Sequence, residues 1–89
     1  MDAYLVQDFS IGDNLRRLRL KAGYTQEELA QELQKSGYTT MCREKISRME
    51  RGKYSIRISL LRELKKILNV SSYDDFFEKT QSSDVNLPE

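Results

Sequence analysis

Residues 43–53, with the sequence REKISRMERGK, bring together side chains that can hydrogen-bond to an extended polar partner. On a helical wheel with about 100° per residue, Ile46 and Met49 fall on one side. Four polar residues spread over the opposite arc: Arg43, Glu44, Ser47 and Arg48. Guanidinium groups read guanine edges, a carboxylate can accept from cytosine, and a hydroxyl can reach a base or a phosphate. The stretch is either an ordinary charged surface helix ending at Gly52 or a helix that lies against an anionic polymer.

The charge of the chain is concentrated in its middle. The net charge of the 89 residues is only +1, but residues 11–66 hold 14 Lys and Arg against 7 Asp and Glu. This region therefore carries +7, whereas residues 1–10 carry −2 and residues 67–89 carry −4. A basic body between acidic ends fits binding to a polyanion, and it fits a solvated surface with uneven ends equally well.

The composition argues against several other kinds of chemistry. The sequence has no His, which is the usual general base and the commonest metal ligand, and its single cysteine, Cys42, cannot form an internal disulfide or a cysteine-based zinc site. It has no phosphate-binding loop, no leader and no apolar run near the roughly 20 residues of a membrane span. We therefore expect a cytoplasmic protein that is not an enzyme, binds no cofactor or metal and does not enter a membrane.

The elements that must position these side chains are helices. Capping-box sequences at residues 10–13 (SIGD) and 25–28 (TQEE) predict the starts of two helices, because the first side-chain oxygen of each can accept from a first-turn amide. Apolar residues then recur at helical spacing, as they do from Ile11 onwards. Gly23 and Gly37 suit the left-handed residue that follows the end of each helix.

Three further helices are predicted after the second one. The first extends from about Cys42 to Gly52, the next from about Arg57 to Leu68, and a short one starts at Ser71 or Ser72. No alternation typical of strands is present, so we predict an all-α fold, a compact bundle of about five short helices. The predicted organisation is an N-terminal segment at residues 1–9, a helical domain at 10–78 and a flexible polar tail at 79–89.

Two segments in this order resemble the Cro/CI-type helix-turn-helix proteins, also called the XRE family. They are GYTQEELA at residues 23–30 and ISRMERGK at residues 46–53. The apolar residues that also match are Ile11, Leu15, Leu18, Leu61, Leu64, Leu68 and Val70. The resemblance covers about residues 11–70 and implies a lambda-repressor-like domain. It implies a sequence-specific regulator of transcription, acting as a repressor that binds a partly palindromic site on double-stranded DNA as a homodimer.

The same resemblance implies roles for individual residues. The base-reading positions of the recognition helix correspond to Arg43, Glu44, Ser47 and Arg48. The positions that contact DNA phosphate correspond to Thr25, Gln26, Lys45 and Lys53. Arg19 and Glu50 correspond to a buried ion pair that ties the first helix to the recognition helix.

The chain departs from the family pattern in three places. The spacing between Ala30 and Ile46 is about six residues longer than usual, which we interpret as another turn on the second helix and a longer connection at residues 37–41. Ile56 stands where the family often has Pro. Cys42 stands where Ser or Thr usually caps the recognition helix, and because a thiol caps weakly we expect Thr39 or Thr40 to cap it.

Some apolar residues exceed what one small core needs. Leu20 lies about opposite Ile11 on the first helix, and we expect four N-terminal residues to fold over it: Tyr4, Leu5, Val6 and Phe9. Five others are possible dimer contacts, in the region through which the family often dimerises: Leu60, Ile67, Tyr73, Phe76 and Phe77. An alternative function is a protein-interaction module, such as a bridging adaptor or the antitoxin of a toxin–antitoxin pair, with a protein partner on its apolar face or tail.

Overall fold

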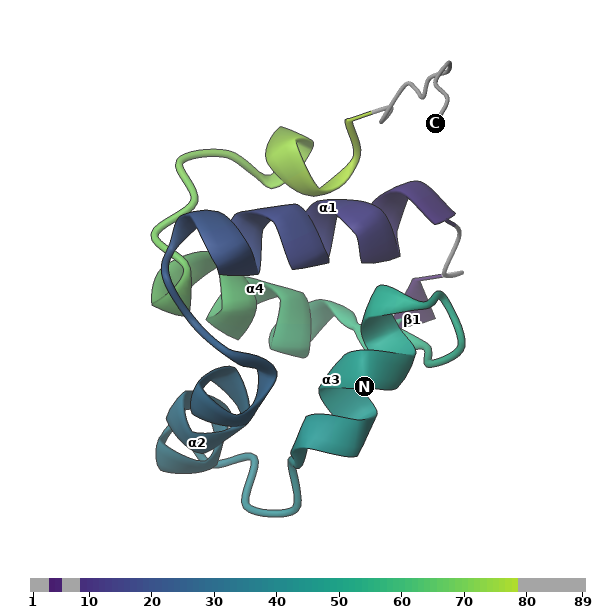
Figure 1. Cartoon of the computed structure of the whole chain (residues 1–89). Coiled ribbons are helices and arrows are strands. Elements are labelled where there is room, and N and C mark those ends of the chain that lie inside the picture. Colours follow the sequence, from purple (N-terminus) through teal and green to yellow (C-terminus); the bar gives the residue numbers. More distant parts are fainter. Residues whose placement is uncertain (1–3, 6–8, 79–89) are drawn as a thin grey trace.

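The computed structural model describes residues 4–5 and 9–78 and shows a helical bundle (Figure 1). Its α-helices are α1 (Phe9–Lys21), α2 (Gln26–Lys35), α3 (Arg43–Glu50) and α4 (Ile58–Ile67). The other elements are the 3-10 helix η1 (Tyr73–Phe76) and two short strands, β1 (Tyr4–Leu5) and β2 (Ile56–Arg57). The predicted all-α bundle is confirmed, with the fifth helix present as a short 3-10 helix.

Two predictions about the N-terminal part are wrong. β1 pairs with β2 in antiparallel orientation, with Tyr4 opposite Arg57 and Leu5 opposite Ile56, although no strand was expected. Leu20 is 52% exposed, and the side chains expected to fold over it, those of Tyr4, Leu5, Val6 and Phe9, lie outside the part of the chain whose side chains are described. Helix α1 also begins at Phe9, so the predicted cap at residue 10 lies within the first turn.

The core is assembled from the apolar faces of all four α-helices, together with residues of the connections and of the C-terminal segment. It contains Ile11, Leu15 and Leu18 from α1, Leu29, Ala30 and Leu33 from α2, Ile46 and Met49 from α3, Leu60, Leu61 and Leu64 from α4, and, outside the α-helices, Met41, Ile56, Leu68, Val70 and Phe76. Full burial of one large apolar side chain contributes about 1.5–3 kcal/mol to folding. These faces therefore fix how the helices pack.

Helix α1 approaches the end of α3 most closely at Gly12. A Cβ atom at this position would lie 2.5 Å from the carbonyl oxygen of Glu50 and 2.8 Å from that of Met49. No side chain fits in this space, because both neighbouring atoms belong to backbone. Gly12 therefore sets the distance between α1 and α3.

The connection between α2 and α3 spans residues 36–42, which is longer than the three- or four-residue turn typical of a helix-turn-helix. It is nevertheless held to the rest of the domain. Met41 is buried, and its carbonyl oxygen accepts a 2.7 Å hydrogen bond from Nε2 of Gln34. The hydroxyl of Tyr38 donates to Oγ of Ser59 at the start of α4, at 3.3 Å. The position of α3 is therefore fixed at its beginning as well as at its end.

The C-terminal segment is attached to α1 on the side away from α3 (Figure 1). Asn14 is completely buried, and its Nδ2 donates to the carbonyl oxygens of Phe76, at 3.0 Å, and Glu78, at 2.6 Å. Nη2 of Arg17 donates to Oδ1 of Asn14 and to the carbonyl oxygen of Asp75, at 3.2 Å each. These bonds hold η1 against the bundle, where Phe76 enters the core.

Candidate nucleic-acid interface

Helix α3 has one buried face and one exposed face. Ile46 and Met49 are completely buried. The polar residues predicted on the opposite arc lie outward: Arg43, Glu44 and Arg48 are exposed and Ser47 is half-buried. The structure therefore brings two guanidinium groups, a carboxylate and a hydroxyl to one surface.

Glu44 remains an anion on this surface. A hydrogen bond from its own backbone amide lowers the pKa of its carboxyl group from the ordinary 4.5, and a bond to the side chain of Cys42 and the charges of Arg43 and Arg48 act in the same direction. Nη2 of Arg43 lies 3.4 Å from Oε2 of Glu44. An ionised carboxylate only accepts hydrogen bonds, so Glu44 can pair with a donor such as an amino group.

The start of α3 differs from the prediction. The N-cap residue is Cys42, and its side chain makes no capping hydrogen bond. Neither Thr39 nor Thr40 caps the helix, so that expectation is wrong. Instead, Nζ of Lys45 donates to the carbonyl oxygen of Thr40 at 3.1 Å and to its Oγ1 at 3.4 Å. Lys45, expected to contact phosphate, thus lies against the α2–α3 connection.

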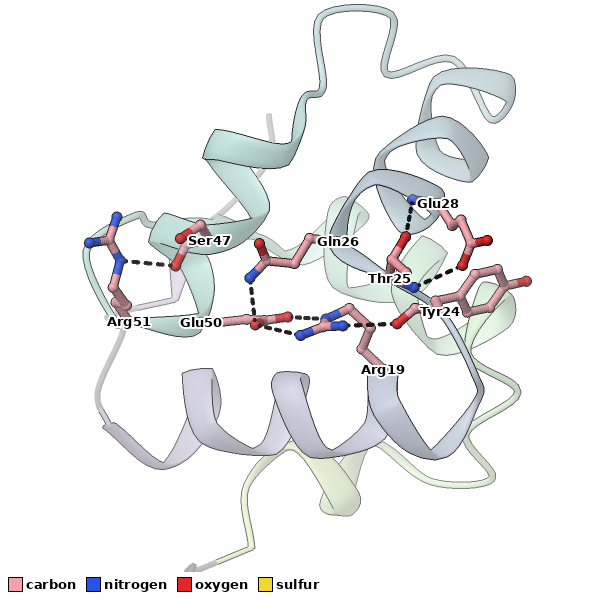
Figure 2. A network of polar contacts seen from close by, with 8 residues as sticks. All are labelled: Arg19, Tyr24, Thr25, Gln26, Glu28, Ser47, Glu50 and Arg51. Carbon is pink, nitrogen blue, oxygen red and sulfur yellow. Dashed lines mark hydrogen bonds and ion pairs between the residues drawn. The ribbon is translucent and has the colours of Figure 1, made fainter.

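The end of α3 is joined to α1 by a buried ion pair (Figure 2). Nε of Arg19 lies 2.6 Å from Oε2 of Glu50, and Nη2 donates to Oε1 at 3.1 Å. The two side chains are only 7% and 3% exposed, and Nη1 of Arg19 also donates to the carbonyl oxygen of Tyr24 at 2.8 Å. Because the pair is buried and bidentate, removing one partner would leave an uncompensated charge, at a cost of about 3–5 kcal/mol.

Gln26 extends this network to the first residue of α2. Its Nε2 donates to Oε1 of Glu50 at 3.0 Å, so Arg19 and Gln26 approach the same carboxylate (Figure 2). Sequence reasoning assigned the Gln26 side chain only to DNA phosphate and missed this bond. We name the three residues Arg19, Gln26 and Glu50 the Glu50 network. It connects α1, α2 and α3 directly.

The predicted capping box at the start of α2 is confirmed. Oγ1 of Thr25 accepts from the amide of Glu28 at 3.0 Å, and Oε1 of Glu28 accepts from the amide of Thr25 at 2.9 Å. Within the described part of the chain, the amides of Gln26 and Glu27 donate to no other group. The Thr25 hydroxyl therefore serves the helix cap, and these two amides remain at the positive end of the helix dipole.

Lys53 lies directly after the turn that ends α3. Gly52 adopts a left-handed conformation with φ of 74°, and the amide of Lys53 donates to the carbonyl oxygen of Arg48 at 2.8 Å. The Lys53 side chain is exposed. Its ammonium makes no ion pair within the described residues, so it can approach an external anion.

The predicted dimer contacts require a correction. Leu60 and Phe76 are 4% and 0% exposed, so both belong to the core and cannot form a contact surface. Ile67 is half-buried and packs against the core. Tyr73 and Phe77 are 41% and 45% exposed. The burial of Phe76 follows from the folding of η1 onto α1, which spacing along the chain does not reveal.

Tyr73 and Phe77 lie beside an apolar groove of about 290 Å³. Ile58, Leu61 and Arg62 of α4 line its other side. Nζ of Lys65 lies 5.2 Å from the centre of the Tyr73 ring, which is within the range of a cation–π contact. We call the surface lined by Ile58, Leu61, Arg62, Tyr73 and Phe77 the C-terminal groove. Ile58 was not singled out from the sequence.

Residues 10–75 match the helix-turn-helix domain family, and the chain therefore belongs to this family. Helices α2 and α3 fit the two helices of the motif, and membership indicates a DNA-binding regulator, in agreement with the resemblance to Cro/CI-type proteins. No curated protein and no solved structure matches the chain significantly. Within the described ranges, no cluster of His, Cys, Asp and Glu suits a metal ion. No helix in this part of the chain has the length and apolar character needed to cross a membrane.

Proposed function

We propose that the protein is a sequence-specific, cytoplasmic regulator of transcription that reads double-stranded DNA with α3. Residues 10–78 form the DNA-binding domain in this proposal. The observation that carries it is the Glu50 network, which fixes α3 with its polar face outward. Arg43 and Arg48 would donate to guanine, Glu44 would accept from cytosine, and Ser47 would reach a base or phosphate.

The residues around α3 support contacts with the DNA backbone. The amides of Gln26 and Glu27 lie at a helix N-terminus, which favours a phosphate. Lys45 lies in the first turn of α3 and Lys53 follows the end of the helix, and both supply positive charge. Thr25 would support a phosphate contact indirectly, because its cap holds the first turn of α2 and the amides there in place. Such contacts position the protein and carry no sequence information, whereas base contacts specify the site.

A dimer is the simplest form for such a regulator. The C-terminal groove offers an apolar surface with exposed Tyr73 and Phe77 for a second copy of the chain. Because η1 lies on the opposite side of α1 from α3, a contact there leaves the reading face uncovered (Figure 1). Two copies would then occupy half-sites about 34 Å apart on a partly palindromic operator. Repression would follow from covering the promoter.

The test is selection from a random pool of double-stranded DNA, followed by titration of the enriched sequence at several salt concentrations. The proposal expects an inverted repeat and an affinity that falls steeply with salt, since each neutralised phosphate adds about 0.9 to the slope. Binding without enrichment of any sequence would mean that the protein binds DNA only through its positive charge, without sequence specificity. Absence of binding at low salt would refute the proposal.

The exposed aromatic side chains also favour a second function, a protein-interaction module such as an antitoxin or bridging adaptor. In that case the C-terminal groove would hold a different protein. Co-purification with the product of a neighbouring gene, lost on Phe77→Ser, would support this function. A clean homodimer that Phe77→Ser converts to a monomer would count against it.

A further inference from the structure

A pocket of about 440 Å³ lies beside α3, between the α2–α3 connection and the segment that leads to α4. Its volume falls in the range of roughly 300–1,000 Å³ that is typical of small-molecule sites. Six of its residues decide its chemistry: Tyr38, Met41, Lys45, Tyr54, Arg57 and Leu60. We call it the α3 pocket.

The charged side chains of the α3 pocket are both positive. Lys45 and Arg57 line it, and none of the described lining residues is acidic. The ammonium of Lys45 donates to the carbonyl oxygen and Oγ1 of Thr40, which are neutral acceptors, and it forms no ion pair in the described part of the chain. The Lys45 side chain is half-buried, while both hydrogen bonds of its ammonium lie at the exposed end, so an anion entering the pocket from solvent can reach the charge. An anion in the pocket would compensate that charge.

The other walls of the α3 pocket are apolar or aromatic. Met41 and Leu60 are 5% and 4% exposed and form part of the core. Tyr38 and Tyr54 are half-buried and pack against the core with part of their surface. Pockets with apolar and aromatic walls and a few placed polar groups suit ligands that combine a ring with a charged group.

We propose that the α3 pocket binds a small organic anion that carries a planar ring, with its acid group at Lys45. A phosphate of the DNA backbone shares the chemistry of the acid group. However, a phosphate on the surface of a duplex would not fill the aromatic and apolar part formed by Tyr38, Tyr54 and Leu60. The free anion is therefore the occupant that uses the whole pocket.

The ligand would regulate DNA binding, an effect that rests on the proposed function. Lys45 immediately precedes Ile46 of α3 and is one of the residues proposed to contact phosphate. A bound anion would neutralise Lys45 and place negative charge beside the reading face. The two ligands would therefore weaken one another, with the Kd for DNA rising on the order of tenfold when the pocket is full.

The first experiment uses the full chain without DNA, so its outcome does not depend on the proposed function. The ¹⁵N-labelled protein is titrated with salicylate and with adenosine 5′-monophosphate to about 10 mM, and with the neutral salicylamide and adenosine. At least one anion is expected to shift amides within residues 38–45 and 54–60. Its neutral counterpart should bind about tenfold more weakly, since the Lys45 contact is lost.

Two variants locate the site, and a third is a matched control. Lys45→Gln should weaken anion binding about tenfold. Ser55→Trp places a large ring at an exposed residue of the pocket lining and should block binding without altering the core. Lys66→Gln removes the same charge from an exposed side chain of α4 that pairs with Glu63, and it should bind the anion like the wild type.

The outcomes separate the possibilities. Two results together support the proposal. The anion causes saturable amide shifts that Lys45→Gln and Ser55→Trp weaken, and its addition to the wild type raises the Kd for the selected DNA. If DNA shifts the amides of the pocket and none of the free anions does, Lys45 is assigned to a backbone phosphate and the proposal is overturned. Anion binding that is unchanged in both variants, or DNA binding that the anion strengthens, would overturn it as well.

Discussion

The contact between Gly12 and the end of α3 makes Gly12→Ala an informative substitution. Within an ordinary helix this change stabilises by up to about 1 kcal/mol, because alanine has the higher helix propensity. Here the added Cβ would lie 2.5 Å from the carbonyl oxygen of Glu50, whereas ordinary contact begins at 3.4 Å. The two helices would have to separate by roughly 0.9 Å, the difference between these distances.

The cost of this separation should exceed the gain in propensity. The neighbouring atoms are backbone atoms of Met49 and Glu50, so no side chain can rotate out of the way. Overpacking of this kind costs typically 1–3 kcal/mol. We expect Gly12→Ala to lower the free energy of unfolding by about 1–2 kcal/mol. For a domain of this size, the melting temperature should then fall by roughly 5–15 °C.

Urea and thermal denaturation measure the effect. Arg16 is exposed in the same helix. The difference in free energy of unfolding between Arg16→Ala and Arg16→Gly therefore gives the gain in helix propensity at a position without a close contact to α3. DNA affinity should also fall at temperatures where Gly12→Ala is fully folded, because Glu50 moves with α3. If Gly12→Ala stabilised the protein as much as the matched change at residue 16, the close approach and the role assigned to it would be refuted.

Arg19→Met should lower the free energy of unfolding, measured by urea denaturation, by about 3–5 kcal/mol. The double variant Arg19→Met with Glu50→Leu should recover part of this loss, because no buried charge is then left without a partner. A double variant as unstable as Arg19→Met would contradict the ion-pair argument. Arg43→Ala should relax preference at one base position by about 1–3 kcal/mol, whereas Lys53→Ala should weaken all sequences alike; equal losses across a set of operator variants would contradict these roles. The pKa of Glu44 is lowered from 4.5, so its carboxylate and any base preference it provides should persist from about pH 8 to about pH 5.5 and be lost only as pH falls through the lowered value. A preference that fades within that range in binding titrations would contradict the assignment.

The local features of the fold could be predicted from the sequence. The cap at Thr25 and the left-handed Gly23 and Gly37 depend on a few neighbouring residues, so their residue types are informative. The burial of Ile46 and Met49 follows from helical spacing alone. The outward position of the polar α3 residues could be predicted for the same reason.

The features that were missed depend on contacts between distant residues. The β1–β2 pair joins residue 4 to residue 57 through only two residues on each side, too few for an alternating pattern. Phe76 is buried because Asn14 holds the backbone of η1 on α1, and no local pattern marks Asn14 for that role. The position of Lys45 follows from the fold of the α2–α3 connection, whose length departs from the family pattern.

The Glu50 network also bears on how quickly the protein could find its target. One carboxylate receives hydrogen bonds from Arg19 of α1 and Gln26 of α2, so three helices should move as a single body. A reading surface that is already assembled loses little conformational entropy on binding. Association would then be limited by electrostatic encounter with the duplex rather than by a folding step, and the on-rate would respond to ionic strength more than to temperature.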